Sequence, residues 1–122
     1  MIADWAPVQE WHRVVSDKDI DAARAAVAED VVISGPKGEA TGVDVFIDWV
    51  EHAGIHLTPV SWHPVDDETI VVEQDATWHH NPHAYPGADP VRVATLFRLE
   101  GDRVAAALRF DDLHQALVAA TG

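Results

Sequence analysis

The sequence predicts a single α+β domain in which helices come first and a mainly antiparallel sheet follows. The predicted helices lie before residue 54, where apolar residues recur at steps of three and four. Strand-like segments separated by short turn-forming stretches follow them. Runs of helices followed by runs of strands are typical of α+β proteins with antiparallel sheets. A length of 122 residues and a hydrophobic content of 48% suit one core, so residues 1–122 are expected to form one domain.

Three helices are predicted in the N-terminal half. The first spans residues 4–15, where the apolar positions fall on one helical face. These positions are Val8, Trp11 and Val15. A second, alanine-rich helix follows Asp19, an N-cap candidate, and its polar end runs through residues 28–30. The third spans Val43 to Ala53, and Gly54 stands where a helix C-cap glycine belongs.

Five strands are predicted. The first is the β-branched run Val31 to Ile33, which stops at Gly35-Pro36 and is followed by a turn around Gly38. The others follow the third helix and cover residues 56–65, 69–80, 91–100 and 103–112. Turn-forming residues separate them, most of all between Asn81 and Pro90. Residues 113–120 would add a closing helical turn.

Composition excludes several function classes. Eight Lys and Arg residues stand against 21 Asp and Glu residues, which gives a net charge of −13 and a field that repels phosphate groups. No nucleic acid and no anionic membrane are therefore expected as partners. The chain has no cysteine, so disulfides, thiolate metal sites and cysteine nucleophiles are excluded. No apolar run approaches ~18 residues and no signal segment is evident, so a cytoplasmic location is expected.

Short motifs along nearly the whole chain carry a resemblance to a known superfamily. In order they are Ser16 to Asp21, Ala28-Glu29-Asp30, Gly35-Pro36-x-Gly38, Thr41-Gly42, Leu96 to Leu99 and Arg109 to Leu113. With this order and spacing the chain resembles the nuclear transport factor 2-like (NTF2-like) superfamily, which includes ketosteroid isomerases, SnoaL-type polyketide cyclases and limonene epoxide hydrolase. The resemblance implies a cone-shaped NTF2-like fold, with three N-terminal helices packed on a curved, mainly antiparallel sheet.

The resemblance also implies one deep, mainly apolar pocket between the helices and the concave face of the sheet. Strand residues reach such a pocket at alternate positions, because side chains alternate between faces. The alignment selects Val31, Ile33 and Gly35; Val72, Gln74, Ala76 and Trp78; and Ala107, Arg109 and Asp111. The residues expected to bind substrate are Trp11, Ile33, Trp49, Gln74, Trp78 and Thr95. The three tryptophans among them would suit a flat ligand, or would fill the cone as core.

The catalytic groups of a ketosteroid isomerase are missing. By resemblance, the general-base aspartate would stand at Gly35, the oxyanion tyrosine at Trp11 and the protonated aspartate at about Thr95. That isomerisation requires a carboxylate base and a neutral acid beside the oxyanion. Glycine and tryptophan supply neither, so ketosteroid isomerase activity is not expected.

Arg109 and Asp111 are the first catalytic candidates. They lie two positions apart on the predicted last strand, the spacing of an arginine and an aspartate in limonene epoxide hydrolase. The match is incomplete, because that enzyme uses a second aspartate and places the pair on a different strand. If they are functional, Arg109 would polarise an oxygen and Asp111 would orient it or accept a proton. The alternative is a structural ion pair at the pocket floor or a dimer surface.

His80 is the third catalytic candidate. It belongs to residues 78–83, the densest cluster of titratable groups, and strand alternation directs His80 inward and His79 outward. His80 would then be a general base, and the alternative is a plain solvent-exposed loop. A zinc site that also used His79 and His83 would need the loop to fold back, so no metal is expected.

Three interpretations of the function remain open, and the third, beside the two described next, is a purely structural homodimer. The first is a cofactor-free isomerase, cyclase or hydrolase of a small hydrophobic oxygenated substrate, with Asp111, Arg109 and His80 as its acid, base and polarising groups. The second is a non-catalytic binding or accessory module with the same cone. No cofactor is expected, because no phosphate-binding glycine loop or dinucleotide fingerprint occurs. The superfamily commonly pairs through the convex face, so a homodimer is expected, with Val71, Val93 and Leu108 facing outward.

Overall fold

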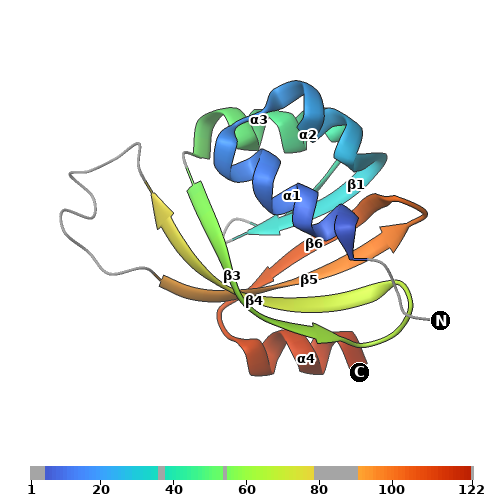
Figure 1. Cartoon of the computed structure of the whole chain (residues 1–122), viewed down its shortest axis with the longest axis vertical. Coiled ribbons are helices and arrows are strands. Elements are labelled where there is room, and N and C mark those ends of the chain that lie inside the picture. The colour runs from blue at the N-terminus through green and yellow to red at the C-terminus, as the bar shows by residue number, and fades with distance from the viewer. Residues whose placement is uncertain (1–4, 36–37, 54, 79–90, 122) are drawn as a thin grey trace.

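The computed structural model describes residues 5–35, 38–53, 55–78 and 91–121 (Figure 1). In chain order the elements are α1 (Ala6–Asp17), α2 (Ile20–Ala26), β1 (Val27–Gly35), β2 (Gly38–Thr41), α3 (Val43–Ala53), β3 (Ile55–Pro64), β4 (Thr69–Trp78), β5 (Val91–Glu100), β6 (Arg103–Phe110) and α4 (Leu113–Thr121). The strands form one sheet in the order β2-β1-β6-β5-β4-β3. The predicted α+β class, with three N-terminal helices on a curved, mostly antiparallel sheet, is confirmed, and α4 is a full fourth helix.

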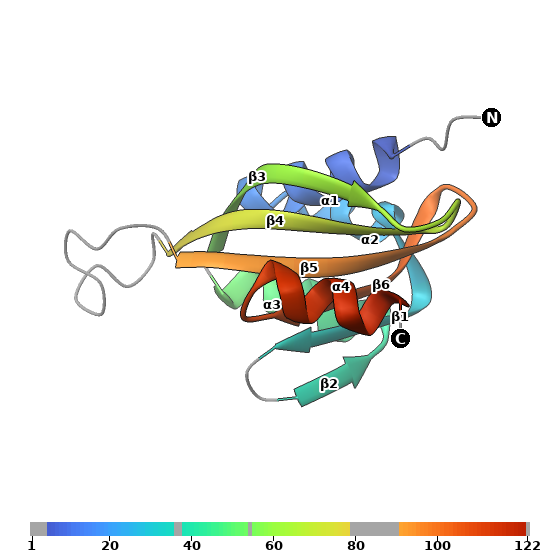
Figure 2. The same ribbon diagram turned by 90° about the horizontal axis from the view of Figure 1, so that it is seen from below.

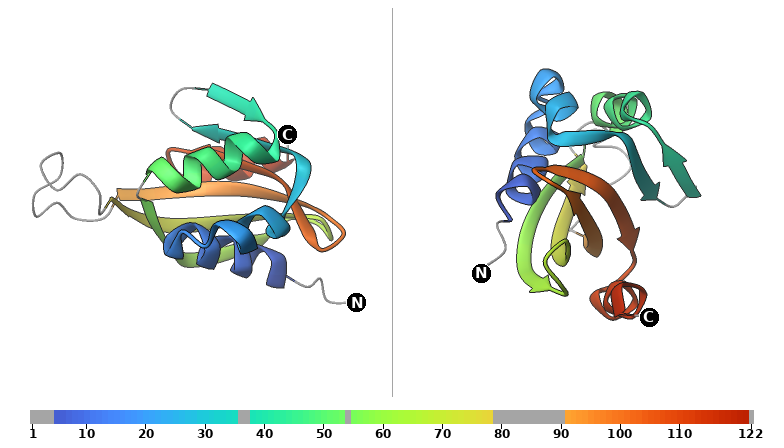
Figure 3. Two further views of the ribbon diagram at one scale, coloured as in Figure 1. Left: turned by 90° about the horizontal axis from the view of Figure 1, so that it is seen from above. Right: turned by 90° about the vertical axis from the view of Figure 1, so that its right-hand side faces the viewer.

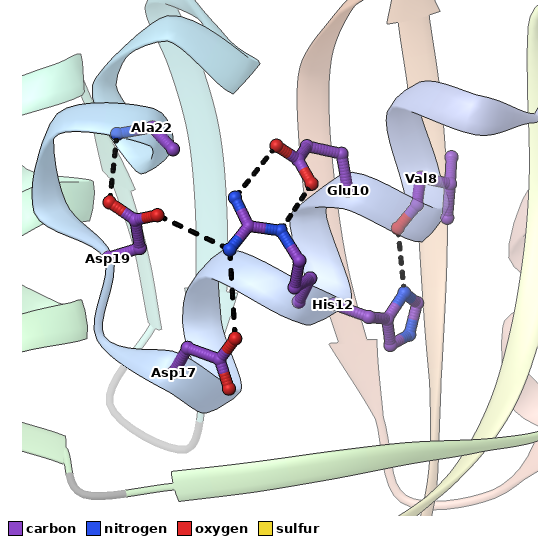
Figure 4. Close-up of polar contacts among 7 residues, drawn as sticks. Val8, Glu10, His12, Asp17, Asp19 and Ala22 are labelled. Carbon is purple, nitrogen blue, oxygen red and sulfur yellow. Dashed lines mark hydrogen bonds and ion pairs between the residues drawn. The ribbon is translucent and has the colours of Figure 1, made fainter.

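The corner between α1 and α2 is fixed by capping and by charge (Figure 4). The side chain of Asp19 accepts a hydrogen bond from the backbone N–H of Ala22 at 3.3 Å, so the predicted N-cap is confirmed. The Arg13 guanidinium meets the carboxylates of Glu10 at 2.6 Å, Asp19 at 3.2 Å and Asp17 at 3.6 Å. These pairs are solvent-exposed, so they orient the corner more than they stabilise it.

The first strand begins earlier than the sequence indicates. The prediction that residues 28–30 end the second helix is wrong, because β1 starts at Val27, which is buried and pairs with Val104 of β6. Pairing with β6 is parallel, whereas all other neighbouring strands run antiparallel. The turn expected around Gly38 belongs to a hairpin in which β2 pairs with β1. Gly38 has a φ angle of 110°, a backbone conformation that residues with a side chain rarely adopt.

The later strands agree closely with the predicted ranges. β5 coincides with the predicted residues 91–100, and β3 and β4 begin within one residue of expectation. β6 ends at Phe110 rather than at residue 112. The predicted C-cap at Gly54, the end of the strand at residues 79–80 and the loop at residues 81–90 lie outside the described residues.

Two hydrophobic cores lie on opposite faces of the sheet. α1, α2 and α3 cover the concave face, and α4 lies on the convex face (Figures 1 and 2). The concave core contains fully buried Phe46 from α3 and Phe97 from β5. The convex core joins Ala116 of α4 to Val71 and Leu96 of the sheet. The protein is therefore a three-layer arrangement with a single sheet in the middle.

The convex face of the sheet, which the sequence predicts as the dimer contact, is covered by α4. Val71 and Leu108 point to that face as predicted, but both pack in the core beneath α4. The prediction for Val93 is wrong, because Val93 is buried in the concave core with Phe97, four positions along the same strand face. No helix within the described ranges is long and apolar enough to cross a membrane.

Candidate functional site

A cavity of about 560 Å³ lies between the helices and the concave face of the sheet. α1 and α3 supply its helical side, and Figure 3 shows α3 on this side of the sheet, next to the β1–β2 hairpin. The strands supply the opposite side through alternate positions, such as Val93 and Thr95 on β5 or Ala107 and Arg109 on β6. The cavity thus occupies the side of the sheet on which the sequence places a pocket.

Most of the residues expected to bind substrate line this cavity. They are Trp11, Ile33, Trp49, Gln74 and Thr95. Arg109, expected to be catalytic, lines it as well. Trp78 ends β4, where its backbone pairs with Ile55, and only this backbone position is described. His80 lies outside the described residues.

Asp111 does not face the cavity. β6 ends at Phe110, so the alternation that brings Ala107 and Arg109 to the cavity stops before Asp111, which is exposed. The sequence places this carboxylate in the pocket, whereas the described lining of the cavity does not include it. Other predicted lining positions lie in the concave core, where helix side chains fill the space above the strands. These are Val31, Val72 and Ala76.

Trp11 and Trp49 form an aromatic wall on the helical side of the cavity. Their rings stack with centroids 6.2 Å apart and planes 23° apart. Trp11 is 3% exposed and meets Phe97 edge to face at 4.8 Å. Its Nε1–H has no hydrogen-bond partner in the described part of the chain, which costs about 1–3 kcal/mol when such a group is buried. Trp11 is thus part of the core as well as the wall, and open space remains beside it.

A chain of hydrogen bonds runs from the cavity into the core. The Thr95 hydroxyl donates to the Gln74 side-chain carbonyl at 2.7 Å, and the Gln74 amide donates to His12 Nε2 at 2.7 Å. His12 Nδ1 then donates to the Val8 carbonyl at 2.8 Å. The three side chains are 4%, 0% and 5% exposed, and each of the three has the hydrogen-bond partner that burial requires.

His12 is neutral in this setting. Burial among the rings of Trp11, Trp62 and Phe97 lowers its pKa to about 4, against a weaker opposing effect of the Val8 carbonyl. Sequence reasoning missed His12. A signal existed, because His12 follows Val8 by four positions and therefore lies on the apolar face of α1, where a polar side chain needs a buried partner.

α3 contributes a second set of polar groups that sequence reasoning missed. One face of this helix packs in the core, and the neighbouring face lines the cavity at the spacing i, i+3, i+4, i+7. The lining residues are Val45, Asp48, Trp49 and His52. His52 Nδ1 lies 2.8 Å from the Asp48 backbone carbonyl and 3.2 Å from its carboxylate. Both side chains are largely exposed.

Arg109 supplies the positive charge of the cavity. Its backbone N–H donates to Ser34 Oγ at 3.1 Å, which ties β6 to β1 where both strands line the cavity. Among the described lining residues, the ionisable side chains are Arg109, Asp48 and His52. The rest of the lining is apolar or neutral. The cavity therefore suits a hydrophobic molecule that carries one or two polar groups.

The described ranges contain no group of three or more His, Cys, Asp or Glu side chains arranged to hold a metal ion. The cluster of His79, His80 and His83 lies outside those ranges. The described cavity presents a charged arginine, a histidine–aspartate pair and a neutral hydrogen-bond chain.

Comparison of the sequence with known protein families agrees with the observed fold. A family model of SnoaL-like domains matches residues 8–107. The chain belongs to the SnoaL-like domain family. The match covers most of α1 and all of α3, which wall the cavity, and the strands as far as Ala107. No curated protein matches this SnoaL-like chain.

Solved structures share the fold of this SnoaL-like protein at low sequence identity. A proposed polyketide cyclase from Sinorhizobium meliloti is 21% identical, with a TM-score of 0.72, over 86% of this chain and 94% of the other. An NTF2-like protein of unknown function from Cytophaga hutchinsonii is 13% identical, with a TM-score of 0.74, over 96% and 97%. A proposed ketosteroid isomerase from Kribbella flavida is 16% identical, with a TM-score of 0.70, over 86% and 74%.

Proposed function

We propose that this SnoaL-like protein binds a small, hydrophobic, oxygen-containing molecule in the cavity of the concave face. The observation that carries the proposal is the cavity itself, with about 560 Å³ of space beside the stacked rings of Trp11 and Trp49. Cavities of this size hold drug-sized molecules, and an aromatic wall suits a flat or polycyclic one. Arg109 and the Gln74–Thr95 pair would meet the oxygen atoms of the ligand.

The reaction that fits this setting is a cofactor-free isomerisation, cyclisation or hydrolysis. Arg109 would bind or polarise a substrate oxygen. A positive charge held beside such an oxygen stabilises the negative charge that develops on it during the reaction. Asp111 has no place in this proposal, because it is exposed beyond the end of β6. Ketosteroid isomerisation is not proposed, since Gly35 and Thr95 stand where that reaction needs carboxyl groups and supply none.

Two of the structural neighbours support the substrate class by their names. The Sinorhizobium meliloti protein is a proposed polyketide cyclase and the Kribbella flavida protein a proposed ketosteroid isomerase. Both names refer to oxygenated, mainly apolar ring compounds. Because one fold hosts many functions, this support extends only to the class of molecule.

A second candidate is a non-catalytic ligand-binding or accessory module that acts as a homodimer. One observation favours it, namely that Asp111 does not join Arg109 at the cavity. A dimer of this kind would need a surface that includes α4, because α4 covers Val71 and Leu108 on the convex face.

Direct binding measurements test the proposed function. Progesterone, a steroid ketone, and emodin, a flat polyketide, are titrated into the protein by isothermal calorimetry. Ala40→Trp adds a large side chain at a residue that lines the cavity, and Ala119→Trp adds the same side chain on the exposed face of α4. We expect at least one probe to bind, and we expect Ala40→Trp to weaken binding about tenfold or more. Binding that is equal in both variants, or no binding at all, would refute the proposal.

A further inference from the structure

The cavity face of α3 holds a histidine whose protonation pattern is set by its neighbours. His52 Nδ1 lies within hydrogen-bond distance of two oxygens of Asp48, the backbone carbonyl at 2.8 Å and the carboxylate at 3.2 Å. Both oxygens only accept hydrogen bonds, so Nδ1 carries the hydrogen. In the neutral ring the other nitrogen, Nε2, then holds the lone pair. A base oriented by an adjacent carboxylate is a recurring arrangement in acid–base catalysis.

We propose that His52 is a general base at the cavity, with Asp48 as its positioning residue, and that Nε2 removes a proton from a carbon of the bound molecule. The proposal rests on the proposed function, because a molecule must occupy the cavity. Trp49 lies between the two residues in sequence and lines the same cavity, where its ring stacks on that of Trp11. Arg109 lines the same cavity and would stabilise the negative charge left on the substrate.

The other ionisable groups near the cavity do not offer this chemistry. Both ring nitrogens of His12 are engaged, one with Val8 and the other with Gln74. Asp111 lies beyond the end of β6 and does not line the cavity, whereas His52 and Asp48 do. The charged groups on α3 and the elements that contact it are otherwise paired, exposed or directed to the backbone. These groups are Arg24 paired with Asp44, Lys18 on the carbonyl of Glu51, and the exposed carboxylates of Asp21, Glu29, Asp30, Glu39 and Glu51.

A generic carbon acid tests the base without knowledge of the natural substrate. The probe is 5-nitrobenzisoxazole, a flat bicyclic molecule with one acidic ring C–H group. Nε2 of His52 takes this proton, and the electrons of the C–H bond complete a nitrile. The N–O bond breaks and its electron pair stays on the oxygen, which gives 2-cyano-4-nitrophenolate. The protonated ring of His52 then returns the proton to water, so no oxidant, reductant or cofactor is consumed.

The experiment measures formation of the coloured phenolate by four proteins and by free imidazole at the same concentration. The variants are His52→Gln, Asp48→Asn and His114→Gln, the last an exposed histidine on α4 across the sheet. We expect His52→Gln to lower kcat about tenfold or more, Asp48→Asn to lower it less, and His114→Gln to match the wild type. The pH profile of kcat should lose one ionisation in His52→Gln and keep it in His114→Gln.

The outcomes separate this inference from the proposed function. A rate for His52→Gln equal to that of the wild type would overturn the base. So would a wild-type rate no greater than that of free imidazole in a protein that binds progesterone or emodin, and the proposed binding function would then stand. A protein that binds none of the three probes would overturn both. Thermal unfolding of His52→Gln, expected to match the wild type, shows that a lost rate is not lost folding.

Discussion

In the buried chain formed by Thr95, Gln74 and His12, only one assignment of hydrogen-bond donors and acceptors is possible. The Val8 carbonyl can only accept, so His12 holds its proton on Nδ1 and its Nε2 must accept from the amide of Gln74. The Gln74 carbonyl then faces Thr95, whose hydroxyl must donate to it. One backbone carbonyl thereby sets a histidine tautomer, an amide orientation and a hydroxyl rotor. The inner end of the cavity consequently keeps a neutral polar surface.

Replacing Thr95 by valine is expected to lower the free energy of unfolding by about 1–3 kcal/mol, because the Gln74 carbonyl oxygen stays buried and loses its donor. Urea denaturation measures this loss. Thr58→Val makes the same chemical change at an exposed position of β3 and should be nearly neutral. Equal losses in the two variants would contradict the importance of the hydrogen-bond chain.

Acidification should weaken the fold through His12. The pKa of His12 is about 4 in the folded protein, where burial disfavours the charged ring, against an ordinary value of 6.5. Between these values the unfolded chain binds the proton and the folded chain does not. The contribution of His12 is therefore complete above about pH 6.5 and is lost as the pH falls toward 4, by about 3 kcal/mol in total.

Urea denaturation of the wild type and His12→Gln at several pH values checks this expectation. The difference between the two proteins isolates the histidine from carboxylates such as Glu10, whose lowered pKa acts in the same direction. The stability advantage of the wild type over His12→Gln should shrink as the pH falls from 7 to 4. An advantage that stays constant across this range would exclude His12 as the source.

The lining of the cavity was predictable at the residue scale, whereas its polar network was not. Helix spacing and strand alternation are local, and they bring Trp11, Trp49 and Gln74 to the cavity. The significance of His12 depends on Gln74, which lies 62 positions further along the chain. Local patterns show only that a histidine stands on an apolar helix face.

At the scale of elements, α3 shows that a helix can be predicted with the right bounds while the residues that line a site on it are missed. Its bounds agree with the prediction because Phe46 and Val50 repeat at helical spacing and are buried. Asp48 and His52 lie on the neighbouring face, which sequence alone does not distinguish from a solvated surface. The β1–β2 hairpin beside α3 makes this face a cavity wall.

For β1 and β6 the element itself was predicted but one of its ends was not, and at β6 this short error misplaced a candidate site residue. Pairing with β6 begins at Val27, so a long-range contact overrides the helical preference of the alanine-rich segment. The predicted last strand continues past Phe110, where β6 ends, and this extension is what directed Asp111 toward the cavity in the prediction. Element ends are the least certain part of a local pattern, and the catalytic role expected of Asp111 depended on one.

At the scale of the whole molecule, the sheet is covered on both faces, which separates two tasks. The concave layer encloses the cavity, and the convex layer under α4 buries an apolar strip that includes Val71 and Leu96. The sequence predicted α4 only as a closing turn, because a short C-terminal run of apolar residues does not reveal which surface it covers. α4 therefore protects a surface that would otherwise expose apolar side chains to solvent.

Placing a charge beneath α4 should uncover this strip. Ala116 is fully buried against Val71 and Leu96, so an unpaired carboxylate in Ala116→Asp cannot remain there and the helix should leave the sheet. We expect the average mass in sedimentation experiments to rise with concentration for Ala116→Asp, whereas Ala119→Asp, with the same charge on the exposed face of α4, should match the wild type. Equal masses for the two variants would show that α4 does not guard an association surface. Because the cavity lies across the sheet, binding of a cavity probe should persist in both variants, which separates loss of the convex layer from general unfolding.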